Sequence, residues 1–377
     1  MTQEDLKDNF TIKKEGYQDV ILPIREDGVN KNYMFTGADG SGKSSLISRL
    51  LLNEVLTNDV SLRIIDVAAT STLLRALIGA DVFDIKEGIS INILPYATKK
   101  SVEIISNTLV ALTNVRLSKE EIDILNKNIL RMVDKHNADL DLTILVRYLQ
   151  HEFPNITFIQ ALYPFTDKNN GKYNLLHGDN EISYTSKQVG FIMNFDCLGS
   201  TYKDYLSVLN ALVAIEIIDK ENDYDTILVN EEAWTFVENE LVVSLLESIT
   251  ERTGKKRLSL FMSTMDPLDF AKNKKGIDFW QSFEIKIMLP TNKIATEVNS
   301  YKELLLAAEV EELTKLPRAF PRKRQNVCIS DQGFVFSAYI PLKENDIFKI
   351  RNKDLDRACE VLKGDRDAID DLVELIA

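Results

Sequence analysis

The sequence contains few residues of the kinds that build disulfide frameworks or metal clusters. Its 377 residues include three cysteines and three histidines, and Cys197, Cys328 and Cys359 lie far apart in the chain. Disulfide-stabilised folds and structural zinc sites need several such residues at close spacing, so both are excluded. We expect all three cysteines to be ordinary buried or partly buried thiols.

Long apolar runs are also missing. The most apolar stretch, residues 206–218, is interrupted by Asn210 and Glu216, whereas a membrane-spanning helix needs about 18 or more apolar residues in succession. The first ten residues contain no basic region followed by an apolar one, so we expect no secretory signal. These two absences predict a cytoplasmic protein.

Positive charge is scarce as well. The formal net charge is −13 and the isoelectric point is near 4.9, which is the wrong sign for a protein whose main task is coating nucleic acid. Contact with nucleic acid would therefore be local, at Gly254–Arg257, Lys272–Lys275 or Arg322–Arg324. These basic stretches fit solvated loops equally well.

The composition that remains, 45% hydrophobic and 27% charged, is that of a soluble globular protein. Short apolar stretches alternate with helical patterns, which predicts an α/β fold with a mainly parallel sheet covered by helices on both faces. Residues 325–342 predict a hairpin that turns at residues 331–333. Residues 118–121 have the form of a helix capping box.

These patterns divide the chain into five parts. We expect a leader and edge strand in residues 1–30, and the first part of the α/β core in residues 31–99. A small all-helical insertion occupies residues 100–155, because the periodicity there is helical throughout. The second part of the core covers residues 156–342, and short polar helices cover residues 343–377.

One glycine-rich stretch carries a recognisable chemistry. Residues 37–44 read GADGSGKS and match G-x-x-x-x-G-K-[ST] between an apolar strand and a helix, the context of a phosphate-binding loop (P-loop). Lys43 would meet the β- and γ-phosphates of ATP, and the Ser44 hydroxyl would bind Mg²⁺. Asp39 should weaken phosphate binding somewhat. The alternative is a glycine-rich turn with a solvated lysine. The expected nucleotide-binding residues are Gly37, Ala38, Asp39, Gly40, Ser41, Gly42, Lys43, Ser44 and Ser45.

A P-loop ATPase also needs a carboxylate near the metal and a base that orients water. The strand ILVN runs directly into Glu231 and Glu232, and we expect it to adjoin the P-loop strand in the sheet. Two assignments remain open. Either Glu231 is the metal-shell acid and Glu232 the base, or Asn230 replaces the acid and Glu231 is the base. Two glutamates at a helix start would also satisfy the helix dipole alone.

With these motifs the sequence resembles a known family, the TraC-type pilus-assembly ATPases of type IV secretion and conjugation systems. They belong to the HerA/FtsK group of RecA-like P-loop motors. The resemblance covers nearly the whole chain. Besides the P-loop, the similar segments are residues 63–96, 163–180, NEEAW at 230–234 for the family's Asp-Glu-Ala-Trp, residues 260–270 and residues 285–292.

The resemblance implies site roles and some departures from them. Ala233 and Trp234 align the motif so that Glu231 takes the aspartate's position and Glu232 is the catalytic carboxylate. Thr264 takes the place of the sensor-strand threonine, but Met265 replaces a glutamine and cannot donate to phosphate. Asp66 keeps a family aspartate, whereas residues 68–70 differ from the family pattern.

The family also implies partners. Its motors work with ATP and Mg²⁺ as rings, usually hexamers, that dock on inner-membrane secretion channel components at the inner face of the cell membrane. A neighbour's arginine enters the nucleotide site; the candidates are Arg252 and Arg257, with Arg318 and Arg322 further along. Three functions follow: a secretion ATPase with slow turnover, a DNA-translocating motor of the same fold, or a nucleotide-binding ring subunit with little turnover.

Overall fold

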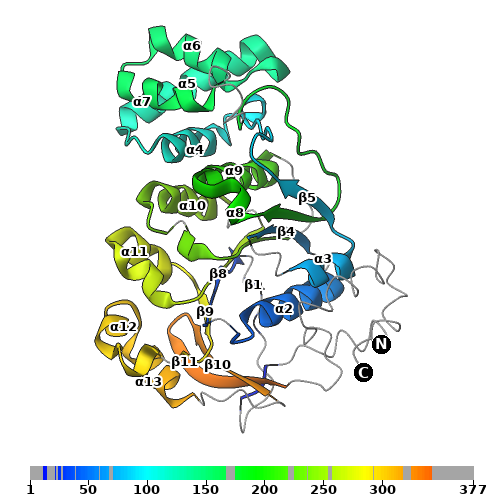
Figure 1. Ribbon diagram of the computed structural model, residues 1–377, viewed down its shortest axis with the longest axis vertical. Helices are drawn as coiled ribbons and strands as arrows, with labels where there is room; N and C mark the ends of the chain where they lie inside the picture. Colours follow the sequence, from blue (N-terminus) through cyan, green and yellow to red (C-terminus); the bar gives the residue numbers. More distant parts are fainter. Residues whose placement is uncertain are drawn as a thin grey trace.

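The computed structural model describes residues 12–14, 22, 24–26, 29–38, 40–58, 60–67, 71–166, 175–219, 225–235, 237–253, 257–291, 293–316 and 324–341. Within them a nine-stranded sheet has the order β11-β10-β9-β3-β8-β7-β4-β6-β5, with helices on both faces (Figure 1). Its strands are β3 Tyr33–Thr36, β4 Ser61–Asp66, β5 Asp81–Ile85, β6 Gln188–Met193, β7 Thr226–Asn230, β8 Leu258–Thr264, β9 Ile285–Met288, β10 Arg324–Asp331 and β11 Phe334–Pro341. A separate two-stranded ribbon is made of β1 Arg25–Glu26 and β2 Val29–Asn30.

The sheet is parallel from β9 to β5 and antiparallel only at the β10–β11 edge. The hairpin between β10 and β11 turns through Gln332 and Gly333, whose φ values are 47° and 88°. Positive φ at both central residues matches the twist of a two-residue hairpin turn. The predicted hairpin and the predicted mainly parallel sheet are both confirmed.

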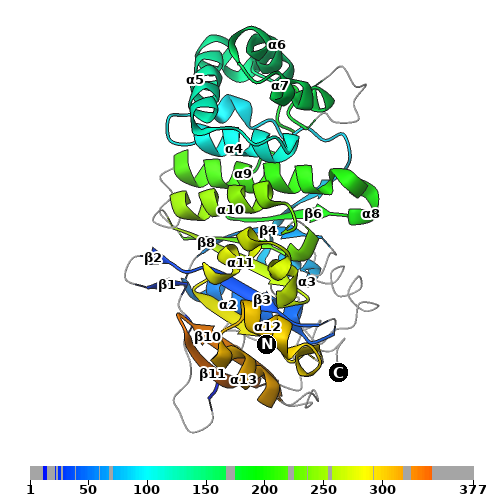
Figure 2. The ribbon, with the colours of Figure 1, turned by 90° about the vertical axis from the view of Figure 1, so that its left-hand side faces the viewer.

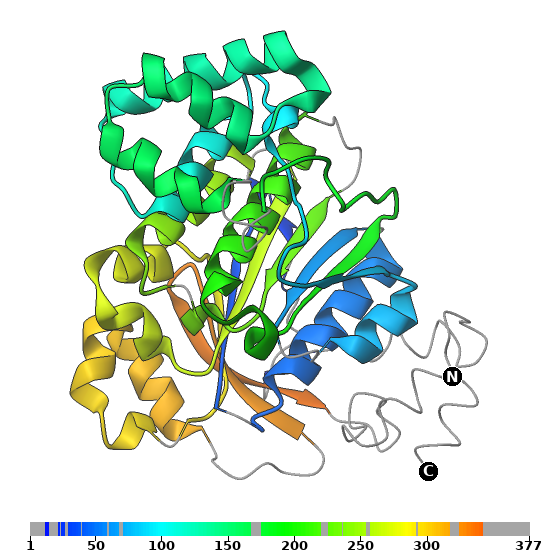
Figure 3. The ribbon, with the colours of Figure 1, turned by 45° about the horizontal axis from the view of Figure 1, so that its top comes forward.

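Alternation along the buried strands separates two cores. Leu62 and Ile64 of β4 pack with α2 (Lys43–Asn58) and α3 (Thr72–Ile78), whereas Ile65 packs with the helices of the opposite face. The second face is covered by α9 (Tyr202–Asp219), α10 (Glu240–Thr253) and α11 (Lys274–Gln281) (Figure 3). We call these the P-loop face and the α9 face. The position of a residue along a buried strand thus determines whether its side chain lies on the P-loop face or on the α9 face.

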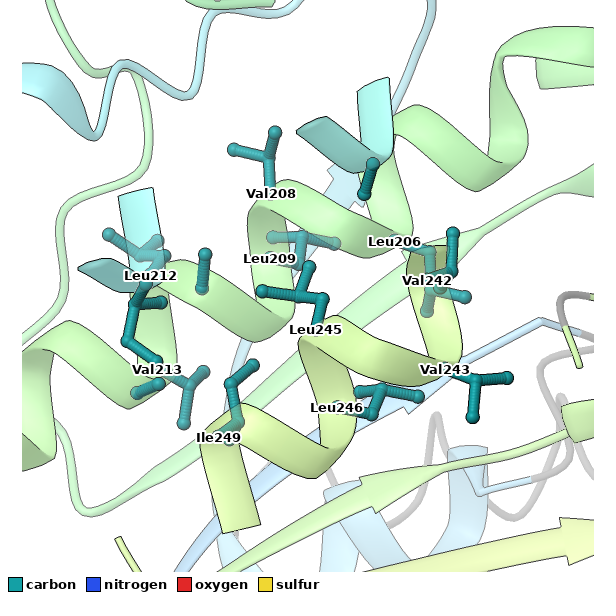
Figure 4. Packing of buried hydrophobic residues seen from close by; sticks show 14 of the residues in the cluster. Leu206, Val208, Leu209, Leu212, Val213, Val242, Val243, Leu245, Leu246 and Ile249 are labelled. Carbon is teal, nitrogen blue, oxygen red and sulfur yellow. The ribbon is translucent and has the colours of Figure 1, made fainter. Parts of the chain in front are cut away.

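The helical insertion stacks on the α9 face. Leucine, valine and isoleucine side chains of α9 interlock with those of α10 (Figure 4), and α4 (Val102–Thr113) packs across both helices (Figure 2). Beyond α4 lie α5 (Lys119–His136), α6 (Leu142–Glu152) and α7 (Ile156–Leu162). The expected capping box is present, since Ser118 Oγ accepts from Glu121 N and Glu121 accepts from Ser118 N.

Several features differ from expectation. Strand β5 was not predicted, because its residues are mostly exposed and its apolar residues do not alternate with polar ones. Helices continue past residue 155, through α7. Three helices after β8 were also missed: α11, α12 (Val298–Leu304) and α13 (Ala307–Lys315). Cys328 is buried as expected, but Cys197, in the short helix α8 (Phe195–Leu198), is exposed, so the expectation for Cys197 was wrong.

Three expectations fall partly or wholly outside the described residues: most of the edge strand at residues 17–24, the helices at 343–377, and Cys359. Among the helices that are described, none is both long and apolar enough to cross a bilayer.

Candidate nucleotide-binding site

The glycine-rich loop connects β3 to α2 at the carboxyl edge of the parallel strands. Gly40 and Gly42 have φ values of 71° and 87°, a region that side-chain-bearing residues rarely adopt. The Gly42 carbonyl accepts from Leu46 N at 3.0 Å and so begins the α2 hydrogen-bond ladder. The backbone N–H groups of the loop therefore lie at the amino end of a 16-residue helix, where the helix dipole favours an anion.

Lys43 is the first residue of that helix and is only 7% exposed. Its ammonium lies 3.5 Å from the Gly37 carbonyl oxygen, which is a long and weak contact. Within the described residues, no carboxylate lies within ion-pair distance of Lys43. A nearly buried cation with no charged partner is costly, and an anion at the loop would offset that cost.

Ser41 is a second loop residue with a buried polar atom. Its hydroxyl oxygen is buried and has no hydrogen-bond partner among the described residues. Ser44 and Ser45 follow at the start of α2 and are partly exposed. The loop residues that the structure describes thus fit the phosphates of a nucleotide. Asp39 lies outside the described residues.

Strand β7 brings the paired acids to the same edge. The Asn230 side chain is fully buried on the α9 face, where its amide exchanges two hydrogen bonds with Asn210 at 2.8 and 3.1 Å. Alternation puts the next residue, Glu231, on the P-loop face, and Glu231 N extends the ladder to the Ile65 carbonyl at 3.2 Å. Glu231 is 4% exposed. Asn230 therefore faces away from the P-loop.

Glu232 is held in an unusual conformation. Its φ is 57°, in the left-handed region that costs a residue with a side chain about 1 kcal/mol or more. The Trp234 indole N–H donates to Glu232 Oε2 at 2.6 Å, and the Thr235 hydroxyl donates to the Glu232 carbonyl at 2.8 Å. The tryptophan of the NEEAW motif thus fixes the direction of the second acid.

A further acid lies at the end of β4. Asp66 is completely buried, and its Oδ2 accepts from Ser71 N at 2.9 Å and lies 3.4 Å from the Arg75 guanidinium.

Burial raises the pKa of the nearby Tyr202 phenol well above its usual range, and the negative charges of Glu232, Asp66 and Glu231 raise it further. Sequence reasoning missed Arg75 and Tyr202, because no motif marks either residue.

The order of the strands corrects one expectation. The P-loop strand β3 and the acid-bearing strand β7 are not neighbours, because β8 lies between them and pairs with both. The Thr264 carbonyl at the end of β8 accepts from Gly37 N at 3.3 Å. The Thr264 hydroxyl instead donates to Asp269 at 2.5 Å on the α9 face. Residue 265 follows at the carboxyl end of β8, between the two halves of the site.

The arginine candidates lie elsewhere. Arg257 precedes β8 at the amino edge of the sheet, opposite the P-loop, and its carbonyl accepts from Thr226 N at 2.7 Å. The Arg252 side chain, Arg318 and Arg322 lie outside what the structure describes. Of the basic stretches, Lys272 pairs with Glu238 and Lys275 with Glu247 on the surface.

Comparison with known proteins extends these observations. No protein-family model and no curated protein sequence matches the chain. Among solved structures, VirB4 of Thermoanaerobacter pseudethanolicus superposes with a TM-score of 0.67 at 16% identity, covering 89% of this chain and 97% of that one. The plasmid coupling protein TrwB with ADP and Mg²⁺ gives 0.54 at 13% identity, covering 91% and 92%. The chain has the fold of VirB4 and TrwB. The RecA-like P-loop ATPase fold predicted from the sequence is confirmed.

Strand β8 lies between the P-loop strand β3 and strand β7, so Lys43 at the start of α2 and Glu231 just after β7 lie at one edge of a single sheet. TrwB with a non-hydrolysable ATP analogue has the same fold as this chain, with a TM-score of 0.56 at 12% identity, covering 84% of this chain and 86% of that one.

Proposed function

We propose that the chain is an ATP-binding and ATP-hydrolysing motor subunit of a type IV secretion or conjugative transfer system. It would energise assembly of the channel or pilus and transfer of the substrate. The observation that carries the proposal is Lys43, a nearly buried ammonium at a glycine loop with no carboxylate partner among the described residues. A triphosphate is the ligand whose charge and shape match a lysine surrounded by backbone N–H groups.

Each residue of the site then has a chemical task. Lys43 neutralises charge on the β- and γ-phosphates, and the backbone N–H groups of the loop hold the phosphate oxygens. Ser44 and Glu231 would hold the Mg²⁺ shell, which in such sites combines a few protein oxygens with phosphates and water. A bound triphosphate would supply the phosphoryl group, and a bound Mg²⁺ would neutralise part of its charge. Glu232, directed by Trp234, orients and deprotonates the attacking water.

Two features support the first of the two assignments of the acids. Asn230 is committed to Asn210 on the α9 face, so it cannot replace the metal-shell acid. Glu231 follows on the P-loop face and is nearly buried. We therefore assign Glu231 to the metal shell and Glu232 to the catalytic base. For Thr264 we propose a structural task, since its hydroxyl fastens the Asp269 turn.

Turnover is expected to be slow in the isolated chain. A glutamate is one methylene longer than the usual aspartate, and a misplacement of ~1 Å can cost about 10²-fold in rate. Met265 removes a donor directed at the transition state, a loss of order 2.7–4 kcal/mol in well-studied enzymes. A ring of subunits, with a neighbour's arginine such as Arg252 or Arg257 at each site, would restore part of that loss.

The partners follow from the type of motor. VirB4 and TrwB supply the precedent for the fold, and the second is described as a conjugative coupling protein. We propose a cytoplasmic ring, a hexamer when active, that docks on secretion channel components at the inner face of the membrane. The alternative substrate is nucleic acid, as for a DNA-translocating motor. It would bind at local basic loops, although the overall charge of −13 repels its phosphates.

A second function is a ring subunit that binds nucleotide with little turnover. The observation in its favour is the pair of departures at Glu231 and Met265. Both leave the P-loop intact while weakening the groups that act on the transition state. Such a subunit would use nucleotide as a structural switch at an interface.

One experiment separates these functions. Mg-ATP binding and ATPase rate are measured for the wild type, Lys43→Ala, Glu231→Gln and Glu232→Gln, with and without single- and double-stranded DNA. A motor binds nucleotide and loses turnover in Glu232→Gln, whereas a switch subunit binds with no turnover in any variant. DNA-stimulated, salt-sensitive turnover identifies a translocase. Absence of nucleotide binding by the wild type would overturn the proposal.

A further inference from the structure

A side chain of the β10–β11 hairpin reaches the P-loop. Gln325 stands near the start of β10 and is 6% exposed, and its Nε2 donates to the Ser41 carbonyl at 2.9 Å. This contact joins segments 284 positions apart in the chain. No motif in the sequence marks Gln325, because the hairpin alternation alone does not show which residue meets the loop.

The position of Gln325 follows from the register of the sheet. Cys328 of β10 pairs with Met288 at the carboxyl end of β9, and β10 runs antiparallel to β9. Residues that precede Cys328 therefore extend beyond β9, over the edge where the P-loop lies. Val327 and Ile329 pack on the P-loop face, so alternation directs Gln325 to that same face.

The contact determines how one peptide unit of the loop is oriented. In a trans peptide the carbonyl and the following N–H point in opposite directions. When the Ser41 carbonyl is held towards Gln325, the Gly42 N–H is therefore directed away from the hairpin. The fit is close on this side, because a Cβ on Gly42 would lie 2.6 Å from Gln325 Nε2. A glycine is required here for its φ of 87° and for this approach.

We propose that Gln325 is a positioning residue for nucleotide binding, which orients the Ser41–Gly42 peptide so that the Gly42 N–H faces the phosphates. This inference rests on the proposed function of the P-loop. It makes the β10–β11 hairpin part of the nucleotide site, although the hairpin contributes no group that touches the reacting atoms. Without Gln325 the Ser41 carbonyl would lose this hydrogen bond, and the orientation of the Gly42 N–H would be held less firmly.

The test compares Gln325→Met, which keeps the length and removes the donor, with the wild type. Mg-ATP and Mg-ADP affinities are expected to fall about fivefold each, as for one hydrogen bond of ~1 kcal/mol. Since the hydrogen bond acts on binding, KM should rise while kcat changes little. Ser337→Ala is the matched control, because it removes a hydrogen bond of the same hairpin, from Ser337 Oγ to Glu312 at 2.6 Å, away from the loop.

The outcomes are distinct. If the wild type and Ser337→Ala bind Mg-ATP and Gln325→Met binds equally well, the inference is overturned while the P-loop assignment stands. If the wild type does not bind nucleotide, the proposed function itself fails. Should Gln325→Met not fold, Gln325→Asn serves instead, since its amide ends one methylene short of Ser41 and should weaken binding in the same way. An effect of Ser337→Ala as large as that of Gln325→Met would also overturn the inference.

Discussion

Replacing Lys43 by methionine should change the stability of the protein in opposite directions with and without nucleotide. The ammonium is nearly buried, and among the described residues its hydrogen-bond partner is the Gly37 carbonyl at 3.5 Å. Removing the charge while keeping the length relieves a desolvation cost that no carboxylate in the described part of the chain offsets. We expect Lys43→Met to raise the free energy of unfolding of the nucleotide-free protein by about 1 kcal/mol.

With nucleotide the sign reverses. A ligand at 100 times its Kd stabilises the folded wild type by ~2.7 kcal/mol, and this increment should vanish in Lys43→Met. The measurement is urea unfolding with and without Mg-ATP, followed by intrinsic fluorescence. The two curves of the variant should coincide, at a midpoint slightly above that of the nucleotide-free wild type.

Lys31 provides the matched control. It is as deeply buried as Lys43, but its ammonium lies 2.6 Å from Glu26 and 3.4 Å from Asp331. Lys31→Met leaves two carboxylates unpaired and should destabilise the protein by about 1–3 kcal/mol without altering the nucleotide increment. If Lys43→Met behaves like Lys31→Met, losing stability and keeping the increment, Lys43 is a structural residue and the reasoning fails.

Three further predictions concern Asp204, Glu232 and Asn230. Burial raises the pKa of the Asp204 carboxyl to about 7. The folded state then holds a proton that the unfolded chain releases near pH ~4, so stability falls as pH rises from ~4 to 7, by roughly 4 kcal/mol in all; urea unfolding of Asp204→Asn should show no such loss. Glu232→Gly relieves the left-handed conformation, so the free energy of unfolding should rise or fall by no more than ~1 kcal/mol relative to the wild type, while ATPase activity disappears. Asn230→Asp buries a charge against Asn210 and should cost about 3 kcal/mol in urea unfolding with no gain in turnover; a faster enzyme would favour the other assignment, in which residue 230 is the metal-shell position.

The sequence predicted the parts of the fold that depend on local pattern. Buried strands such as β4 and β7, the capping box at Ser118 and the β10–β11 turn each combine periodicity with a terminating signal, so their positions agree with the structure. Strand β5 was missed because an exposed edge strand has no apolar alternation. The order of strands in the sheet was also missed, since adjacency is a tertiary property that no local pattern contains.

The same distinction applies to the site. The P-loop was visible because the glycines and Lys43 are adjacent in sequence. Arg75, Tyr202 and Gln325 were not, because each reaches the site from a different element through packing. The choice between the two acid assignments also needed the structure. The bond between Asn230 and Asn210, together with the separate cores that contain Leu228 and Val229, shows which face of β7 each residue occupies.

The position of β8 makes Met265 the residue whose replacement is most informative. Strand β8 separates the P-loop strand from the strand that carries Glu231, so its carboxyl end lies between the phosphate-binding loop and the acids. Thr264 directs its side chain to Asp269 on the α9 face, and alternation then directs residue 265 towards the P-loop face. A glutamine there could donate a hydrogen bond to the γ-phosphate, which a thioether cannot do.

We expect Met265→Gln to raise kcat at least ~10-fold, a conservative share of the 2.7–4 kcal/mol that one transition-state donor supplies elsewhere. Nucleotide affinity should change little, because the new bond strengthens as charge develops on the phosphoryl group. Met265→Leu is the control, since it keeps an apolar side chain of similar volume and should match the wild type. Equal rates for the glutamine and leucine variants would mean that residue 265 does not face the phosphates. The slow turnover would then be attributed to Glu231 in place of an aspartate.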